Sequence, residues 1–212
     1  MVQHALNIVY EDANVLVVNK PAGVLSQPGK TVDGSIATQV RNAYPEATGS
    51  LLVHRLDMDT SGLLMLAKTK EAHRNLQQQF EKRAVRKRYC ALLDHEPNGG
   101  GGRVVLPLRL DIDNRPSQIV CFEHGKASET LWYRANVNAN KHETARVFFH
   151  PLTGRSHQLR VHAASPLGLN RPIRGDRLYG VADNRMYLHA DQLGFYHPET
   201  QKPIILTCPA PF

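Results

Sequence analysis

The densest polar stretch of the chain is His54-Arg-Leu-Asp-Met-Asp-Thr-Ser-Gly62, and a short apolar run flanks it on each side. Residues 51–53 precede it and residues 63–68 follow it, and both runs predict buried strands. Two strands would hold the polar residues rigidly, which is how a scaffold presents catalytic groups on a connection. Asp57 and Asp59 are candidates for a general acid/base pair. The alternative is a turn in which Asp57, Thr60 and Ser61 satisfy backbone N–H groups.

Apolar periodicity on either side of this stretch indicates many short strands and few helices. Helices are expected at residues 35–44 and 71–82, and a short one should begin at Ser156, a good N-cap residue. Further strands are expected at residues 6–10, 15–19, 88–93, 128–137, 145–150, 187–190 and 204–207. This mixture predicts an α+β fold built around one large, mixed but mostly antiparallel sheet with flanking helices.

The loop at residues 94–102 ends in four glycines, Gly99-Gly-Gly-Gly102. A phosphate-binding loop would need a following Lys-Ser or Lys-Thr pair, or the strand and helix context of a dinucleotide site, and neither occurs here. The glycines are therefore interpreted as the flexible tip of a linker.

The charge of the chain is unevenly distributed. The 212 residues include 26 Lys and Arg against 19 Asp and Glu, a net charge of +7, and 42% apolar residues exclude a disordered chain. Residues 1–80 carry seven side chains of each sign, so the whole excess lies in residues 81–212. A one-sided basic surface attracts polyanions, of which nucleic acid is the commonest in a cell. The run from Glu81 to Tyr89 holds five basic residues beside an aromatic that can stack on a base; a solvated basic face with a core tyrosine is the alternative.

Three cysteines, Cys90, Cys121 and Cys208, lie far apart, which argues against a disulfide framework and a zinc knuckle. The first residues contain neither a basic segment nor a long apolar one, so no signal peptide is expected. No apolar run approaches the roughly 20 residues that span a bilayer. The sequence predicts a cytoplasmic protein that has no membrane partner.

A second polar cluster is Gly154-Arg-Ser-His-Gln-Leu-Arg-Val-His162. His157 and His162 are five residues apart, which misses the i, i+4 spacing of a helical zinc pair, so no metal site is expected. Histidines that contact phosphate, or that are hydrogen-bonded in the core, are the preferred interpretation.

His54-Arg-Leu-Asp57 followed by Thr60-Ser-Gly-Leu-Leu64 resembles the signature of the RluA-type pseudouridine synthases. Other segments match the family in the same order: Asn19-Lys-Pro-Ala-Gly23, Lys87-Arg-Tyr89, the cluster at 154–162, Gly175-Asp-Arg-Leu-Tyr-Gly180 and Leu188-His-Ala190. The resemblance covers nearly the whole chain, from Ile8 to Phe212. Residues 99–102 and 169–173 depart from the family pattern and bear on which RNA is accepted.

The resemblance implies a pseudouridine synthase fold with a central active-site cleft, and an enzyme that isomerises uridine in RNA. The reaction breaks the N1–C1′ bond, rotates the base, rejoins it through C5 and removes the C5 proton, so neither a cofactor nor ATP is needed. Asp57 is implied as the catalytic aspartate, either capturing an electron-poor C1′ or abstracting a sugar proton. Arg160 would pair with Asp57 and keep it ionised, and Tyr89 would stack on the base and assist proton removal.

Further roles also follow from the resemblance. Arg55 would fill the space that the uridine leaves when it flips out of its stack. Other RNA contacts are expected from His54, Lys87, Arg88, Arg155, His157, Gln158 and Leu188.

The resemblance also implies the organisation and the partners of the chain. The family often carries an S4 RNA-binding domain before the segment that begins here at Asn19, and so few residues precede Asn19 that a single catalytic domain over residues 1–212 is expected. This short form is most similar to the branch that modifies a uridine in 23S ribosomal RNA and one in a tRNA anticodon stem-loop. No protein partner is implied, and a monomer is expected.

Two other functions fit parts of the same pattern. A non-catalytic RNA-binding protein on this fold would not need an intact set of Asp57, Tyr89 and Arg160. A carboxylate-dependent hydrolase of nucleosides or glycans would release the free base, whereas a synthase keeps the base in the polymer.

Overall fold

The computed structural model describes residues 6–29, 34–135 and 145–212 of the chain. Packing divides the chain into two compact units: Met1–Lys87 with His189–Pro211, and Arg88–Leu188 with Phe212. The chain passes from one unit to the other within strands β4 (Arg86–Leu93) and β10 (Leu188–Tyr196). No helix in the described ranges is long and apolar enough to cross a membrane.

The first unit contains a mixed sheet whose strands follow the order β1-β2-β3-β10-β11. The bounds are β1 (Ile8–Glu11), β2 (Val15–Lys20), β3 (Ser61–Ala67) and β11 (Pro203–Thr207). Neighbouring strands are antiparallel except β3 and β10, which pair in parallel through Ser61 with His189 and Gly62 with Ala190. All of β3 and most of β2 are buried, which explains why both are nearly continuous apolar runs.

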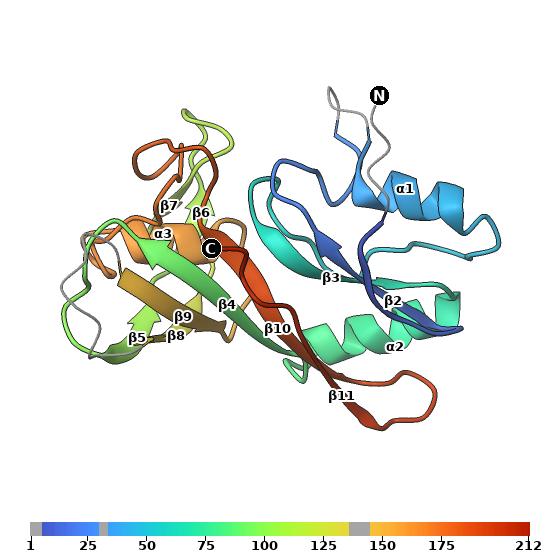
Figure 1. Ribbon diagram of the computed structural model, residues 1–212. Coiled ribbons are helices and arrows are strands. Elements are labelled where there is room, and N and C mark those ends of the chain that lie inside the picture. Colours follow the sequence, from blue (N-terminus) through green and yellow to red (C-terminus); the bar gives the residue numbers. More distant parts are fainter. Residues whose placement is uncertain (1–5, 30–33, 136–144) are drawn as a thin grey trace. The chain divides into compact units, whose positions relative to one another are not determined.

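Two helices cover opposite faces of β2 and β3, as Figure 1 shows: α1 (Ile36–Ala43) and α2 (Lys70–Glu81). Ser35 and Thr69 are their N-caps, and each side chain accepts the backbone N–H three residues further on. The buried side of α2 packs on alternate residues of the two strands, with Leu76 against Met65 and its neighbours. Both helices predicted from the sequence are thus confirmed.

The second unit contains an antiparallel sheet in the order β4-β9-β8-β5, a small β6–β7 sheet and one helix. The bounds are β5 (Gly101–Val105), β6 (Leu108–Leu110), β7 (Gln118–Val120), β8 (Glu129–Arg134), β9 (Ala145–Pro151) and α3 (Gln158–Ala164). One face of the large sheet packs against α3 and the β6 region, where Trp132, Phe149 and Leu159 belong to one buried cluster. This core fixes α3, which carries the second polar cluster of the sequence.

Three local predictions are wrong. Residues 51–53 form no strand, because Leu52 makes only an isolated bridge with Leu66. Gly101 and Gly102 lie in β5 and not in a flexible tip, since they pair with Tyr133 and Trp132 of β8.

The third error concerns the start of α3. The helix begins after His157, whose backbone is left-handed with φ of 52°, and Ser156 is not the cap. The side chain of Gln158 turns back instead, and its Oε1 accepts the backbone N–H of Arg155. This bond fixes the turn that leads into α3, and no side chain of the N-cap residue His157 caps the helix.

Candidate active site

Asp57 lies on a turn whose backbone is held on both sides. Before it, the Ser26 hydroxyl accepts the N–H of Leu56 at 3.0 Å and donates to the Leu56 carbonyl at 2.7 Å. After it, the Lys20 ammonium donates to the Met58 carbonyl at 2.9 Å. The half-buried carboxylate of Asp57 is therefore presented from a short segment that cannot shift freely.

Lys20 is fully buried, and sequence reasoning gave it no role. Its Nζ also donates to the carbonyls of Pro21 at 2.8 Å and Val24 at 2.7 Å, so three acceptors surround the three N–H groups of an ammonium. Burial lowers the pKa of Lys20 to about 7, and the negative charges of Asp59 and Asp57 act in the opposite direction. A buried ammonium group is thus built into the fold beside the turn that carries Asp57.

The turn ends where β3 meets β10. Gly62 has a φ of +111°, and a Cβ at this position would lie 2.3 Å from the Ala190 carbonyl oxygen, so only glycine fits. His189 donates from Nε2 to the Cys208 carbonyl at 3.0 Å, which leaves Nδ1 to accept from the Ser61 hydroxyl at 2.9 Å. These contacts fix the far end of the polar stretch to the sheet.

His54 and Lys87, two predicted RNA contacts, lie close together in the first unit. The His54 ring stacks on Phe80 at 5.0 Å between centroids, and its Nε2 accepts the Met65 N–H at 3.0 Å. Burial and the positive charge of Lys87 lower the pKa of His54 to about 3, so the ring is neutral. Arg55, by contrast, is exposed.

Arg160 is held by a partner that sequence reasoning missed. Its Nε and Nη2 donate to the two carboxylate oxygens of Asp176, both at 2.7 Å, and both side chains are buried. Asp176 also accepts the backbone N–H groups of Leu178 and Tyr179. A bidentate pair of this kind fixes the plane of the guanidinium. The Gly175–Gly180 motif was the available signal, because it placed an aspartate in a segment shared with the family.

Tyr179 links Arg160 to His157. The Arg160 guanidinium lies 5.1 Å from the centre of the Tyr179 ring. The Tyr179 hydroxyl lies 2.7 Å from His157 Nδ1 and accepts the backbone N–H of Gln118 in β7 at 2.6 Å. The structure therefore brings two of the predicted residues, Arg160 and His157, into one connected cluster.

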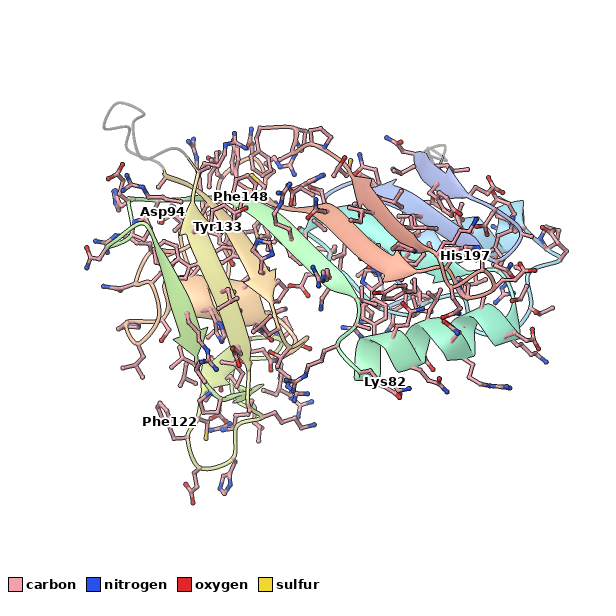
Figure 2. All side chains as sticks on the ribbon, turned by 90° about the horizontal axis from the view of Figure 1, so that it is seen from below. Lys82, Asp94, Phe122, Tyr133, Phe148 and His197 are labelled. Atoms are coloured by element: carbon pink, nitrogen blue, oxygen red, sulfur yellow. The ribbon has the colours of Figure 1, made fainter. Side chains whose placement is uncertain are left out.

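Tyr89 and Arg88 are neighbours in β4 and so project to opposite faces of the sheet. Tyr89 pairs with the buried Phe149 and packs against the core cluster that contains α3. The Arg88 guanidinium lies 4.8 Å from the ring of Phe148, beside Tyr133 on β8 (Figure 2). The two residues therefore face different surroundings.

The remaining predicted contacts in the second unit differ in exposure. Gln158 is buried, and its Nε2 donates to the Glu129 carbonyl and to the Thr130 hydroxyl, both at 2.9 Å. Leu188 is buried in the core cluster. Arg155 is exposed, and its Nε donates to a backbone carbonyl at residue 127. Their roles toward RNA stay predictions.

Asp57 belongs to the first unit, and Tyr89 and Arg160 belong to the second. The pairing of Asp57 with Arg160 stays a prediction. Within the described ranges, no three His, Cys, Asp or Glu side chains are grouped as a metal site would require.

Comparison with known proteins assigns the family. A profile described as RNA pseudouridylate synthase matches residues 14–165. The dual-specificity RNA pseudouridine synthase RluA of Escherichia coli (strain K12) is 42% identical over 98% of this chain and 94% of its own. The chain belongs to the RNA pseudouridylate synthase family. It is an RluA-type RNA pseudouridine synthase, an isomerase that acts on RNA.

Other relatives agree with this assignment. The RluA protein of Yersinia pestis is 41% identical over 97% of this chain and 99% of its own. The solved structure of human RNA pseudouridylate synthase domain containing 1 has a TM-score of 0.79 and 31% identity, covering 98% of this chain and 84% of that one. Human RNA pseudouridylate synthase domain containing 4, at 24% identity and a TM-score of 0.74, supports the α+β fold alone, over 97% of this chain and 88% of that one. The predicted fold class and enzyme class are confirmed.

Proposed function

We propose that this synthase modifies a uridine in 23S ribosomal RNA and one in a tRNA anticodon stem-loop, with Asp57 as the catalytic carboxylate. The observation that carries the proposal is the clamped turn of Asp57, held through Ser26 and Lys20. The RluA relatives that align over almost the whole chain are named dual-specificity enzymes, which favours two RNA substrates.

In the proposed mechanism Asp57 acts at the sugar of a flipped-out uridine. The carboxylate either captures C1′ as the N1–C1′ bond breaks or takes a sugar proton, and both routes free the base to rotate. As the base rejoins through C5, the bond between Asp57 and C1′ breaks on the first route, and Asp57 returns the sugar proton on the second. N1 gains a proton and the C5 proton leaves to water, so the atoms balance without a co-reactant. Both routes need Asp57 ionised.

The other residues bind and orient. Asp176 fixes the plane of the Arg160 guanidinium. In the proposal this guanidinium pairs with Asp57, and Tyr89 stacks on the base. Arg55 is exposed and takes the place of the flipped uridine in the RNA stack. The protein acts as a cytoplasmic monomer and needs no protein partner.

The test uses the wild-type protein with transcripts that carry [5-³H]uridine, one a 23S ribosomal RNA fragment and one a tRNA anticodon stem-loop. Tritium release with the base retained in the polymer is expected for both RNAs, and transcripts with cytidine at the modified position serve as controls. Free uracil would indicate a hydrolase instead. Binding without tritium release would indicate a non-catalytic RNA-binding protein.

A further inference from the structure

A cavity of about 540 Å³ lies beside the segment that leads into the Asp57 turn. One wall is the face of α1 that carries Ala37 and Asn42, the opposite wall is residues 50–55, and Gln27 and Pro28 also line it. All of these residues belong to the first unit. Asp57 is not among the lining residues, so the cavity is not the place of the reacting uridine.

The cavity wall contains both apolar and polar side chains. Leu51 and Val53 are buried in it. Of the polar side chains that also line it, four have no hydrogen-bond or ion-pair partner among the described residues: Gln27, Asn42, Ser50 and Arg55. These groups can therefore hydrogen-bond to a ligand without breaking an existing contact of the described chain.

The charge of the wall is positive. The lining contains Arg41 and Arg55, and no Asp or Glu. Arg41 is already used, because its guanidinium donates to the carbonyls of Ala47 and Gly49, both at 2.6 Å. It fixes the turn beyond α1 and adds its positive charge to the site. Arg55 is exposed and can reach an anion.

This combination fits a nucleotide. Unpaired bases in RNA are recognised by apolar or aromatic contact with the ring and by hydrogen bonds to its edges. Amide side chains such as Gln27 and Asn42 donate and accept at once, as a base edge requires, and an arginine suits the phosphate. The volume lies within the range of small-molecule sites.

We infer that this cavity binds an unpaired nucleotide of the substrate RNA close to the target uridine, and that it contributes to substrate choice. The inference rests on the proposed function. Arg55 lines the cavity and is also the side chain expected to enter the RNA stack, so a second base displaced from that stack would meet the cavity directly.

The experiment combines a filled cavity with missing bases in the RNA. Asn42→Trp fills the cavity from α1. The matched control is Gln78→Trp, an exposed polar residue of α2 that lines a different cavity, one with Glu71 and Glu199 in its wall. Each protein is tested in single turnover on intact stem-loop RNA and on a series with one abasic site at each loop position except the target.

At one loop position, an abasic site should slow wild type and Gln78→Trp about tenfold. Asn42→Trp should be about tenfold slower than wild type on intact RNA. An abasic site at that same loop position should not slow this variant any further. Asn42→Ala, which removes the amide without adding bulk, should show a smaller loss with the same position dependence.

The inference would be overturned if the rate losses from Asn42→Trp and from the abasic site multiplied at every loop position. It would also be overturned if Asn42→Trp matched wild type on every RNA. Both outcomes leave the proposed function intact. A wild-type protein inactive on intact RNA would overturn both.

Discussion

Lys20 shows how a single buried side chain supports the turn that carries Asp57. Its ammonium donates to three carbonyls, one of them that of Met58, the residue after Asp57. The Met58 carbonyl also accepts the backbone N–H of Gly23 at 2.9 Å, whereas the carbonyls of Pro21 and Val24 accept from Lys20. A carbonyl left without a donor in the interior costs about 1–3 kcal/mol, and these part-buried carbonyls should cost less. An ionisable side chain is unusual at a position with no exposed surface. Here it joins the end of β2 to the turn.

Lys20→Met should therefore lower the free energy of unfolding by about 1–3 kcal/mol. The methionine stem fills a similar volume but donates no hydrogen bond, so the turn around Asp57 loosens and the turnover of the folded protein also falls. Urea unfolding with a parallel activity assay checks this. Wild-type stability in the variant would show that the three contacts contribute nothing.

Arg55 should act in base flipping and not in bond chemistry. Arg55→Ala should lose most on a structured stem-loop, where unstacking the uridine is costly, and less on a short flexible RNA whose uridine is already unstacked. Single-turnover rates of both proteins on both RNAs measure the difference. Equal fractional losses would place Arg55 in the chemical step or in general RNA affinity.

At the scale of elements, α3 is anchored by a buried histidine. Ser128 gives its one hydroxyl hydrogen to the Leu106 carbonyl, so it accepts from His162 Nε2 at 2.8 Å. Nδ1 then accepts from the Thr130 hydroxyl at 2.9 Å. The ring is neutral in this arrangement, and burial lowers the pKa of His162 to about 4.

This anchor makes stability depend on pH. Between the unfolded pKa of about 6.5 and the folded pKa of about 4, the unfolded chain binds a proton that the folded chain does not. The contribution of His162 to the free energy of unfolding is fully present above pH 6.5. It is lost as the pH falls to 4, and the loss is at most about 3 kcal/mol.

His162→Gln keeps a hydrogen-bond donor and an acceptor but does not titrate. Its stability should therefore fall less than that of wild type between pH 6.5 and pH 4. Thermal unfolding at pH 7, 5.5 and 4 compares the two proteins. Parallel curves would mean that His162 does not titrate in this way.

The elements with a strong local pattern were predictable from the sequence. α2 has periodic apolar residues and a threonine cap, and β2 and β3 are apolar runs, so all three lie where expected. The short β6 and β7, which pair with each other, carry too few residues for a pattern. β5 begins with two glycines, and its partner β8 lies further along the chain. Residues 51–53 are apolar because they are buried, and burial alone does not make a strand.

The site was predictable only in part for the same reason. Asp57, Arg55, Tyr89 and Arg160 are candidates because they stand in motifs that resemble a family, and their roles stay predictions. Lys20, Ser26 and Asp176 act through contacts with residues 38, 30 and 16 positions away. No local sequence pattern predicts such a pairing, so these contacts are seen only in the folded chain.

For the molecule as a whole, RNA affinity should fall steeply with salt, because a net charge of +7 implies phosphate contacts and released counterions. Lys82, at the end of α2 (Figure 2), and Arg86 are exposed and are expected to contribute. Lys87 and Arg88 are half-buried against Phe80 and Phe148, and should contribute less.

Lys82→Ala and Arg86→Ala should each reduce the slope of log K against log[salt] by about 1, measured by filter binding. Lys202→Ala, in the exposed turn between β10 and β11, is the control and should leave the slope unchanged. A flat wild-type plot would contradict the account of RNA binding.

The central claim is that the Asp57 carboxylate is the catalytic group, and Asp57→Asn tests it most directly. The change is nearly isosteric and removes only the charge, while the clamps from Ser26 and Lys20 act on the backbone of Leu56 and Met58 and are retained. We predict wild-type folding and RNA affinity with no detectable tritium release from [5-³H]uridine RNA. Activity within tenfold of wild type, in a preparation free of host enzyme, would contradict the assignment.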